Sequence, residues 1–272
     1  MTVVWAWADL GDNALQKYSI KQYWLITSVL SVTKFNPDWK KVFVVDQITY
    51  DFLEEKGWTT LWDEILIQDF SNTEFGNLYN IKIYSWPKLY SYFLIDDDIL
   101  VLDIDVVFIK PFEIPDKNMM CGILYNHKND FVHKIGGISN LSYKWPFIDE
   151  VQKTLERQNI ESDFIFSNTD LCVVGSPVYV PKHFNKCVTP IIIKHIQNIE
   201  NYYCNITPND TYQSIEEEFP LAKIGINNGG LKEIKIGTFM HGFINNSKYT
   251  ISTGLKFIEK LLGIDIYNKY FT

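Results

Sequence analysis

The chain has 272 residues, 46% of them hydrophobic and 15% aromatic, which is enough apolar side chain for one large domain with a buried core. Its formal net charge of -8 repels nucleic-acid phosphates at long range, which argues against a general nucleic-acid-binding protein. The 4 cysteines are widely spaced, and no run of about 18 uncharged apolar residues occurs. These patterns argue against a disulfide scaffold, a structural zinc site and a membrane span.

The first residues, MTVVWAWADLGD, include no basic stretch and no long apolar run. We therefore expect no signal peptide and a cytoplasmic location. The many Ile, Asn and Lys residues are typical of low-GC bacterial and viral genomes, and for a viral protein the expected location is the host cytoplasm.

Short apolar runs of strand type alternate with helix-like segments through roughly the first 110 residues. The predicted strands are residues 3–7, 41–46, 65–68 and the apolar run that breaks at Asp103. The predicted helices are residues 14–34, residues 48–56 before Gly57, and a segment that begins near Ser85 with Pro87 in its first turn. This alternation predicts a doubly wound α/β fold with a mainly parallel central sheet flanked by helices.

The second half of the chain carries fewer clear signals. Its predicted strands are residues 119–124 and 171–174, and its predicted helices are residues 147–157, 181–198 and 249–262. Since neither an internal repeat nor a linker is recognisable, we expect one domain over residues 1–272.

A pair of carboxylates follows the apolar run in LVLDIDVVFIKP, where Asp103 and Asp105 are two residues apart. Open α/β sheets bind ligands at the carboxyl ends of their strands. Residues i and i+2 of a strand point to the same face, so the two like charges are costly unless a cation neutralises them. Mn²⁺ or Mg²⁺, which prefer oxygen ligands, would also leave positions open for diphosphate oxygens.

The alternative interpretation of this pair is a solvated acidic strand end, because D-x-D sequences also occur by chance. A second acidic cluster, residues 96–98, lies upstream. It falls at the beginning of the same strand, the wrong end for a ligand, so we interpret it as a solvated turn.

The segment WPKLYSYFLIDDDILVLDIDVVFIKPF resembles the core of GT-A glycosyltransferases, above all families 8 and 32 and related uncharacterised domains. In those enzymes a helix with a basic residue precedes a strand, a D-x-D motif and a proline-containing exit. The resemblance implies a single GT-A-like (Rossmann-like) domain that binds a nucleoside-diphosphate sugar, most commonly a UDP-sugar, with a divalent metal, usually manganese. The first half of the chain, about residues 1–112, would bind the donor, and the second half, about residues 113–272, would form the acceptor side.

The same resemblance implies a metal site completed near the C-terminus. In FMHGFINNSKY, His241 would join Asp103 and Asp105 as a metal ligand, while Gly242 and Lys248 would bind the donor, Lys248 at its diphosphate. Imidazole and carboxylate together suit Mn²⁺. The alternatives are a core histidine and a surface lysine.

Further donor contacts are implied at the ends of the predicted strands. Lys88 matches the basic residue of the helix before the D-x-D motif, and Ile104 lies within that motif. The nucleoside would lie against Trp5, Ala6, Trp7 and Asp46. A tryptophan there could stack on the base and Asp46 could accept a hydrogen bond, although a strand-end tryptophan is more often part of the core.

The acceptor side is matched by two segments. In SNTDLCVVGS, Asn168 fits a residue near the donor sugar, and Asp170 stands where the family has glycine. In DTYQSIEEEFPLA, Glu217 and Glu218 match an acidic position, with a solvated acidic face as the alternative. One of these carboxylates would act as the base in an inverting enzyme or would stabilise the cationic sugar in a retaining one. The D-x-D and histidine pattern favours retention.

The expected activity is transfer of a sugar from a nucleoside diphosphate to a hydroxyl of a glycan or another acceptor, as in a hexosyltransferase. One alternative is a nucleotidyltransferase, which would normally carry a glycine-rich, basic phosphate loop, and ADLGDNAL is a poor match to one. The other is an inactive sugar- or nucleotide-binding protein of the same fold. A nucleic-acid partner is not expected.

Overall fold

A computed structural model describes residues 1–9, 14–72, 86–114, 118–125, 173–183, 231–234, 237–241 and 248–272. Within them, a seven-stranded sheet has the order β3-β2-β1-β4-β7-β6-β8. Its strands are β1 (Thr2–Trp7), β2 (Lys40–Val45), β3 (Glu64–Ile67), β4 (Ile99–Leu102), β6 (Met119–Tyr125), β7 (Val173–Val180) and β8 (Leu231–Glu233). Neighbouring strands pair in parallel except at β7, which is antiparallel to both β4 and β6. The prediction of a mainly parallel sheet is therefore confirmed. The sheet is mixed, because one of its strands, β7, is reversed.

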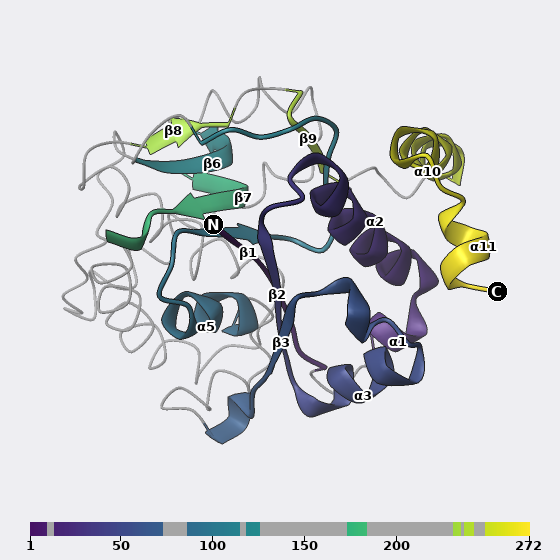
Figure 1. Ribbon diagram of the computed structural model, residues 1–272, viewed down its shortest axis with the longest axis horizontal. Helices are drawn as coiled ribbons and strands as arrows, with labels where there is room; N and C mark the ends of the chain where they lie inside the picture. The colour runs from purple at the N-terminus through teal and green to yellow at the C-terminus, as the bar shows by residue number, and fades with distance from the viewer. Residues whose placement is uncertain are drawn as a thin grey trace, which may run out of the picture.

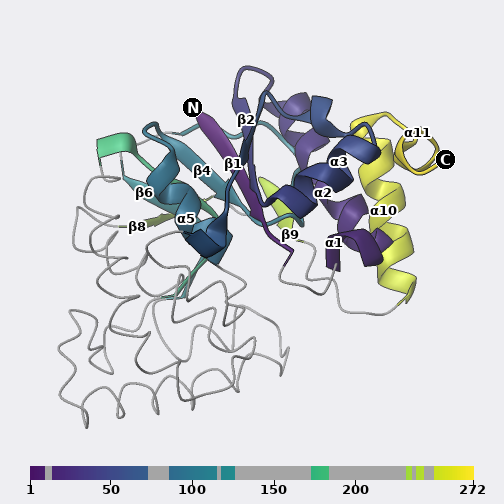
Figure 2. The same ribbon diagram turned by 90° about the horizontal axis from the view of Figure 1, so that it is seen from below.

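Helices cover both faces of this sheet (Figures 1 and 2). They are α1 (Ala14–Lys17), α2 (Ser19–Phe35), α3 (Gln47–Glu55), α5 (Trp86–Leu94), α10 (Lys248–Leu262) and α11 (Ile266–Tyr270), with short 3-10 turns η1 (Thr59–Leu61) and η2 (Phe70–Asn72). In both views α2 and α3 lie on one side of β1 and β2 and α5 lies on the other, while α10 and α11 lie outside α2. The described residues thus form the flanked α/β fold that the alternating pattern predicts.

The central strands carry continuous apolar runs because helices bury both of their faces. Every residue of β4 is buried, and so are all residues of β2 after Lys40. Val3, Val4 and Trp5 of β1 are completely inaccessible to solvent. The continuous apolar runs seen in the sequence are therefore strands of a sheet that is covered on both sides.

The helix predicted over residues 14–34 is interrupted in the structure. Tyr18 has an extended backbone between α1 and α2. The side-chain amide of Gln22 donates to the carbonyl oxygens of Leu15 and Gln16, both at 2.9 Å, so it satisfies acceptors that α1 leaves open at its end. The prediction of one continuous helix was wrong because helical spacing of apolar residues continues across a break that side-chain hydrogen bonds stabilise.

A second, two-stranded sheet begins directly after the D-x-D motif. Strand β5 (Val106–Phe108) pairs antiparallel with β9 (Phe239–His241). The chain therefore leaves the main sheet after β4, turns at the two aspartates and enters another sheet. This change of sheet places Asp103 and Asp105 at a corner of the fold.

The helix predicted over residues 249–262 agrees with α10 to within one residue. The strand predicted over residues 171–174 overlaps β7 only at residues 173 and 174, and β7 continues to Val180. The helix predicted over residues 147–157 and most of that over residues 181–198 lie outside the described residues. In the described part of the chain, no helix combines the length and the apolar character needed to cross a membrane.

Candidate donor-binding site

The candidate site lies where the strand order of the main sheet reverses. From β1 the chain proceeds outward to β2 and β3 and then returns to the other side of β1 as β4. Since these four strands are parallel, their carboxyl ends share one edge. Ligands of open α/β sheets bind in the crevice outside such a switch point, here between β1 and β4. Trp7, Asp46 and Asp103 are each at or next to the carboxyl end of one of these strands.

The D-x-D motif forms a tight turn and does not continue the strand. The amide of Val106 donates to the carbonyl oxygen of Asp103 at 3.1 Å, and residues 103–105 lie between β4 and β5. Asp103, Ile104 and Asp105 are all partly exposed, in contrast to the buried strands on either side. The expectation that the two carboxylates follow the i, i+2 rule of a strand was wrong, because the chain changes sheets at this point.

Lys88 and Asp103, both predicted to bind the donor, form an ion pair. The Nζ of Lys88 is 2.6 Å from Oδ1 of Asp103, and the side chains are 15% and 34% exposed. Lys88 is in the first turn of α5, which contacts β1 and leads to the start of β4. The basic side chain is thus brought from a crossover helix to the D-x-D turn, where it also offers positive charge to an anionic ligand.

The two strand-end tryptophans differ in accessibility. Trp5 is completely buried, and its Nε1 donates to Oγ of Ser28 at 2.9 Å. This burial excludes the base stacking predicted for its side chain. Trp7 is partly exposed, as is Ala6, and the ammonium of Lys21 lies 5.0 Å from the centroid of the Trp7 ring. Trp7 is therefore the tryptophan of β1 that can contact a ligand.

Asp46 has a structural role at the same edge. It is the N-cap of α3, where its Oδ1 accepts from the amide of Thr49 at 2.9 Å. Its Oδ2 accepts from the amide of Asp9 at 2.8 Å, so this one buried carboxylate joins the ends of β1 and β2. The hydrogen bond from a base or ribose to Asp46 remains a prediction. The observed hydrogen bonds show that Asp46 holds the segments after β1 and β2 together at the carboxyl edge of the sheet.

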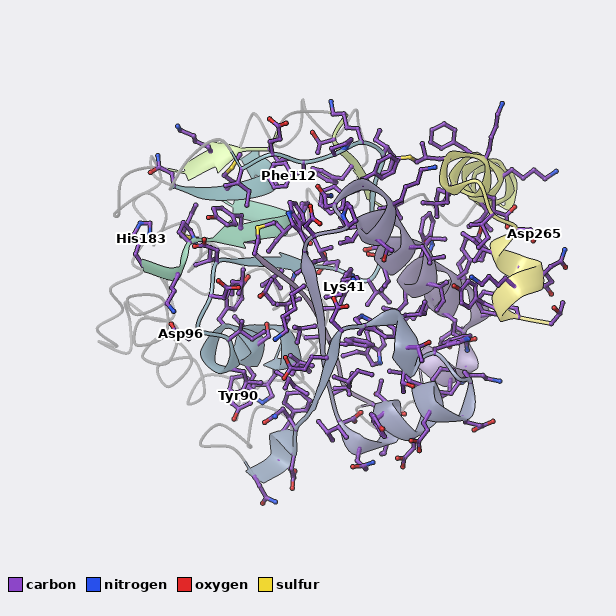
Figure 3. All side chains as sticks on the ribbon, in the orientation of Figure 1. Lys41, Tyr90, Asp96, Phe112, His183 and Asp265 are labelled. Atoms are coloured by element: carbon purple, nitrogen blue, oxygen red, sulfur yellow. The ribbon has the colours of Figure 1, made fainter. Side chains whose placement is uncertain are left out.

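Replacing Asp46 by Ala is expected to lower the free energy of unfolding by about 2–3 kcal/mol, because a helix cap is lost and a buried amide loses its acceptor. Urea denaturation followed by circular dichroism measures this change. The matched control is Asp265→Ala, which removes the N-cap of the peripheral helix α11 (Figure 3) and should cost about 1 kcal/mol or less. Equal losses in the two variants would contradict the role of Asp46 in joining the strands.

His241 is brought to the D-x-D turn by its backbone. In β9 it pairs with Val106, the residue that follows Asp105. Lys248 is the first residue of α10. The side chains of His241 and Lys248 lie outside the described part of the structure, as do Asn168, Asp170, Glu217, Glu218 and Gly242 altogether. Their predicted roles therefore stay predictions.

Among the side chains that the structure describes, which exclude that of His241, no group of three or more His, Cys, Asp and Glu residues is close enough to hold an ion. The two carboxylates of the D-x-D turn would thus need a ligand from elsewhere, such as His241 or a bound diphosphate.

Three residues near the site were not predicted from the sequence. Lys21 contacts the ring of Trp7, Ser176 accepts a hydrogen bond from the amide of Asp103, and Ser28 donates one to the carbonyl of Val106. A serine inside the largely apolar segment of residues 22–32 is a detectable signal for Ser28. No local pattern indicates Ser176, because it meets Asp103 only through strand pairing.

The sequence matches no protein family and no curated protein. Among solved structures, the fold is similar to PaToxG glycosyltransferase, with 9% identity, a TM-score of 0.42 and coverage of 97% of this chain and 78% of that one. It is also similar to the apo form of the glycosyltransferase GlyE of Streptococcus pneumoniae TIGR4, with 13% identity, a TM-score of 0.41 and coverage of 85% and 44%. Apo mouse xyloside xylosyltransferase 1 has 9% identity, a TM-score of 0.44 and coverage of 86% and 85%.

Proposed function

We propose that the protein is a metal-dependent glycosyltransferase that moves a sugar from a nucleoside diphosphate, with UDP favoured, to an acceptor hydroxyl. The observation that carries the proposal is the Lys88–Asp103 ion pair on the D-x-D turn, at the switch point of a mainly parallel sheet. This arrangement joins a cation and a pair of carboxylates at the edge where such sheets bind ligands.

The chemistry of the turn fits a divalent cation. Asp103 and Asp105 present partly exposed carboxylates two residues apart, and the β9 register supports His241 as a third ligand. Oxygen ligands with one imidazole suit Mn²⁺, and Mg²⁺ is the alternative. When bound, the cation supplies charge neutralisation for the diphosphate that departs from the anomeric carbon.

The residues of this chain would bind and orient the donor. Lys88 would share its ammonium between Asp103 and a donor oxygen, which adds positive charge where the leaving group develops negative charge. Trp7 would offer an aromatic face to the base, and Lys248 would contact the diphosphate. A carboxylate from Asp170, Glu217 or Glu218 would stabilise the cationic sugar in a retaining reaction, which we favour, or deprotonate the acceptor in an inverting one.

Donor hydrolysis without acceptor tests the proposed reaction, because water can replace the acceptor hydroxyl. The purified chain is incubated with Mn²⁺ and a panel of UDP- and GDP-sugars, and proton NMR follows free sugar and its first-formed anomer. Release of sugar with the donor's anomeric configuration supports a retaining glycosyltransferase. Binding of the donors without turnover would indicate an inactive binding protein. Pyrophosphate release from nucleoside triphosphates, with no sugar release, would indicate a nucleotidyltransferase.

Lys88→Met is expected to weaken binding of Mn²⁺-UDP by about tenfold, which corresponds to one lost charge-assisted hydrogen bond. Binding of Mn²⁺ alone should not weaken, because Asp103 then lacks its competing ammonium. Isothermal titration calorimetry measures both affinities. The matched control is Lys182→Met, since Lys182 pairs with Asp96 at 3.1 Å near the opposite end of β4. If both variants lose nucleotide affinity equally, Lys88 has no specific role in donor binding.

A further inference from the structure

We infer that Ser176 and Ser28 are positioning residues that hold the D-x-D turn in the shape needed to bind the cation. The inference rests on the proposed function and extends it to two residues outside the motif. Each serine makes a hydrogen bond to the backbone at one end of the turn, from a different element of the fold. Neither serine is expected to touch the donor.

Ser176 holds the first residue of the turn. Strand β7 runs antiparallel beside β4 with Val101 opposite Val178, which brings Ser176 next to Asp103. The amide of Asp103 donates to Oγ of Ser176 at 2.8 Å, and Ser176 is only 5% exposed. The reversed strand thus fixes the backbone from which the first carboxylate projects.

Ser28 holds the residue that closes the turn. Its Oγ donates to the carbonyl oxygen of Val106 at 2.6 Å and accepts from Nε1 of Trp5 at 2.9 Å. Ser28 and Val106 are completely buried, so water cannot replace either bond. The amide of Val106 is bonded to Asp103 at the same time, which closes the turn between the two serines.

The two hydrogen bonds together limit the positions that the carboxylates of Asp103 and Asp105 can take. A turn between two sheets lacks the ladder of hydrogen bonds that fixes residues within a strand, so its carboxylates need other contacts to keep one arrangement. Two buried hydroxyls supply those contacts from two separate elements, α2 and β7. Loss of either hydroxyl should widen the range of positions that the carboxylates occupy and weaken binding of the cation, as loss of supporting hydrogen bonds does at other metal sites.

The test measures Mn²⁺ alone by electron paramagnetic resonance, which reports free Mn²⁺, on the full chain and its variants. Ser176→Ala and Ser28→Ala are each expected to lower the affinity by about tenfold or more. The matched control is Ser31→Ala. Ser31 lies one turn further along α2, is also completely buried, and accepts from the amide of Phe108 at 3.0 Å, two residues beyond the residue that Ser28 holds. Its Oγ also donates to the carbonyl oxygen of Ser28 at 2.6 Å, so both of these bonds lie outside residues 103–106. Its loss should lower the melting temperature and leave the affinity for Mn²⁺ nearly unchanged.

The outcomes separate this inference from the proposed function. No Mn²⁺ binding by the wild type would overturn the metal-dependent function and this inference with it. Binding by the wild type that Ser176→Ala and Ser28→Ala retain, or lose only as much as Ser31→Ala does, would overturn the inference alone. Ser176→Thr, which keeps the hydroxyl acceptor, should restore the affinity. If Ser176→Ala does not fold, Ser28→Ala decides the question in the same titration against Ser31→Ala.

Discussion

Replacing Asp103 and Asp105 together by Asn is expected to abolish metal-dependent binding of UDP. The two residues supply both carboxylates of the turn, and affinity for a divalent cation depends strongly on the number of charged ligands. Asn keeps the size of each side chain and removes its charge, so the fold should persist. Isothermal titration of UDP with and without Mn²⁺ should show a loss of affinity of about 100-fold or more in the presence of the metal.

A second acidic pair provides the control for this experiment. Asp96 and Asp98 have the same spacing and flank the opposite end of β4. Asp98 accepts from the amide of Lys182 at 2.8 Å, and Asp96 forms an ion pair with the same lysine. Both aspartates therefore have a structural role. Asp96→Asn/Asp98→Asn should therefore bind Mn²⁺-UDP like the wild type. The same titration is repeated with GDP and other nucleoside diphosphates. If the Asp103/Asp105 variant binds them all as the wild type does, the two aspartates are not part of a donor site and the motif is only a solvated acidic segment.

Trp5→Ala is expected to lower the free energy of unfolding by about 3–5 kcal/mol, one of the largest effects of a single substitution in the described core. The indole is fully buried in β1, so its removal leaves a cavity. It also removes the donor to Ser28, which holds the end of the D-x-D turn. Chemical denaturation monitored by circular dichroism gives the change in stability.

Trp7→Ala is the matched control because Trp7 is two residues further along the same strand and has a partly exposed side chain. Its stability loss should not exceed about 2 kcal/mol, since less apolar area returns to water. If Trp7 contacts the base, this variant should instead lose nucleotide affinity. Comparable destabilisation in the two variants would contradict the division between a core tryptophan and a ligand-facing one.

Much of the fold could be predicted because local sequence patterns carry the information. Apolar runs of four to six residues at β1, β2 and β4 indicate strands covered on both faces, and the helical segments between them require parallel pairing. The sequence predicts that Gly57 stops the helix before it, and Gly57 does follow the end of α3 with a positive φ of 68°. The position of the D-x-D motif at the end of β4 follows from the same patterns.

Local patterns in the sequence therefore predict the alternating α/β order, the strand end that carries Asp103 and Asp105, and Lys88 as a candidate partner of the site. The folded arrangement shows in addition that the motif is a turn between two sheets, that Trp5 is buried while Trp7 is partly exposed, and that Asp46 caps a helix. It also shows the contact of Ser176 with Asp103 across 73 positions of the chain. The physical reason is that periodicity and turn chemistry act between neighbours in sequence, whereas these contacts depend on strand order, register and packing of segments that meet only in the folded chain.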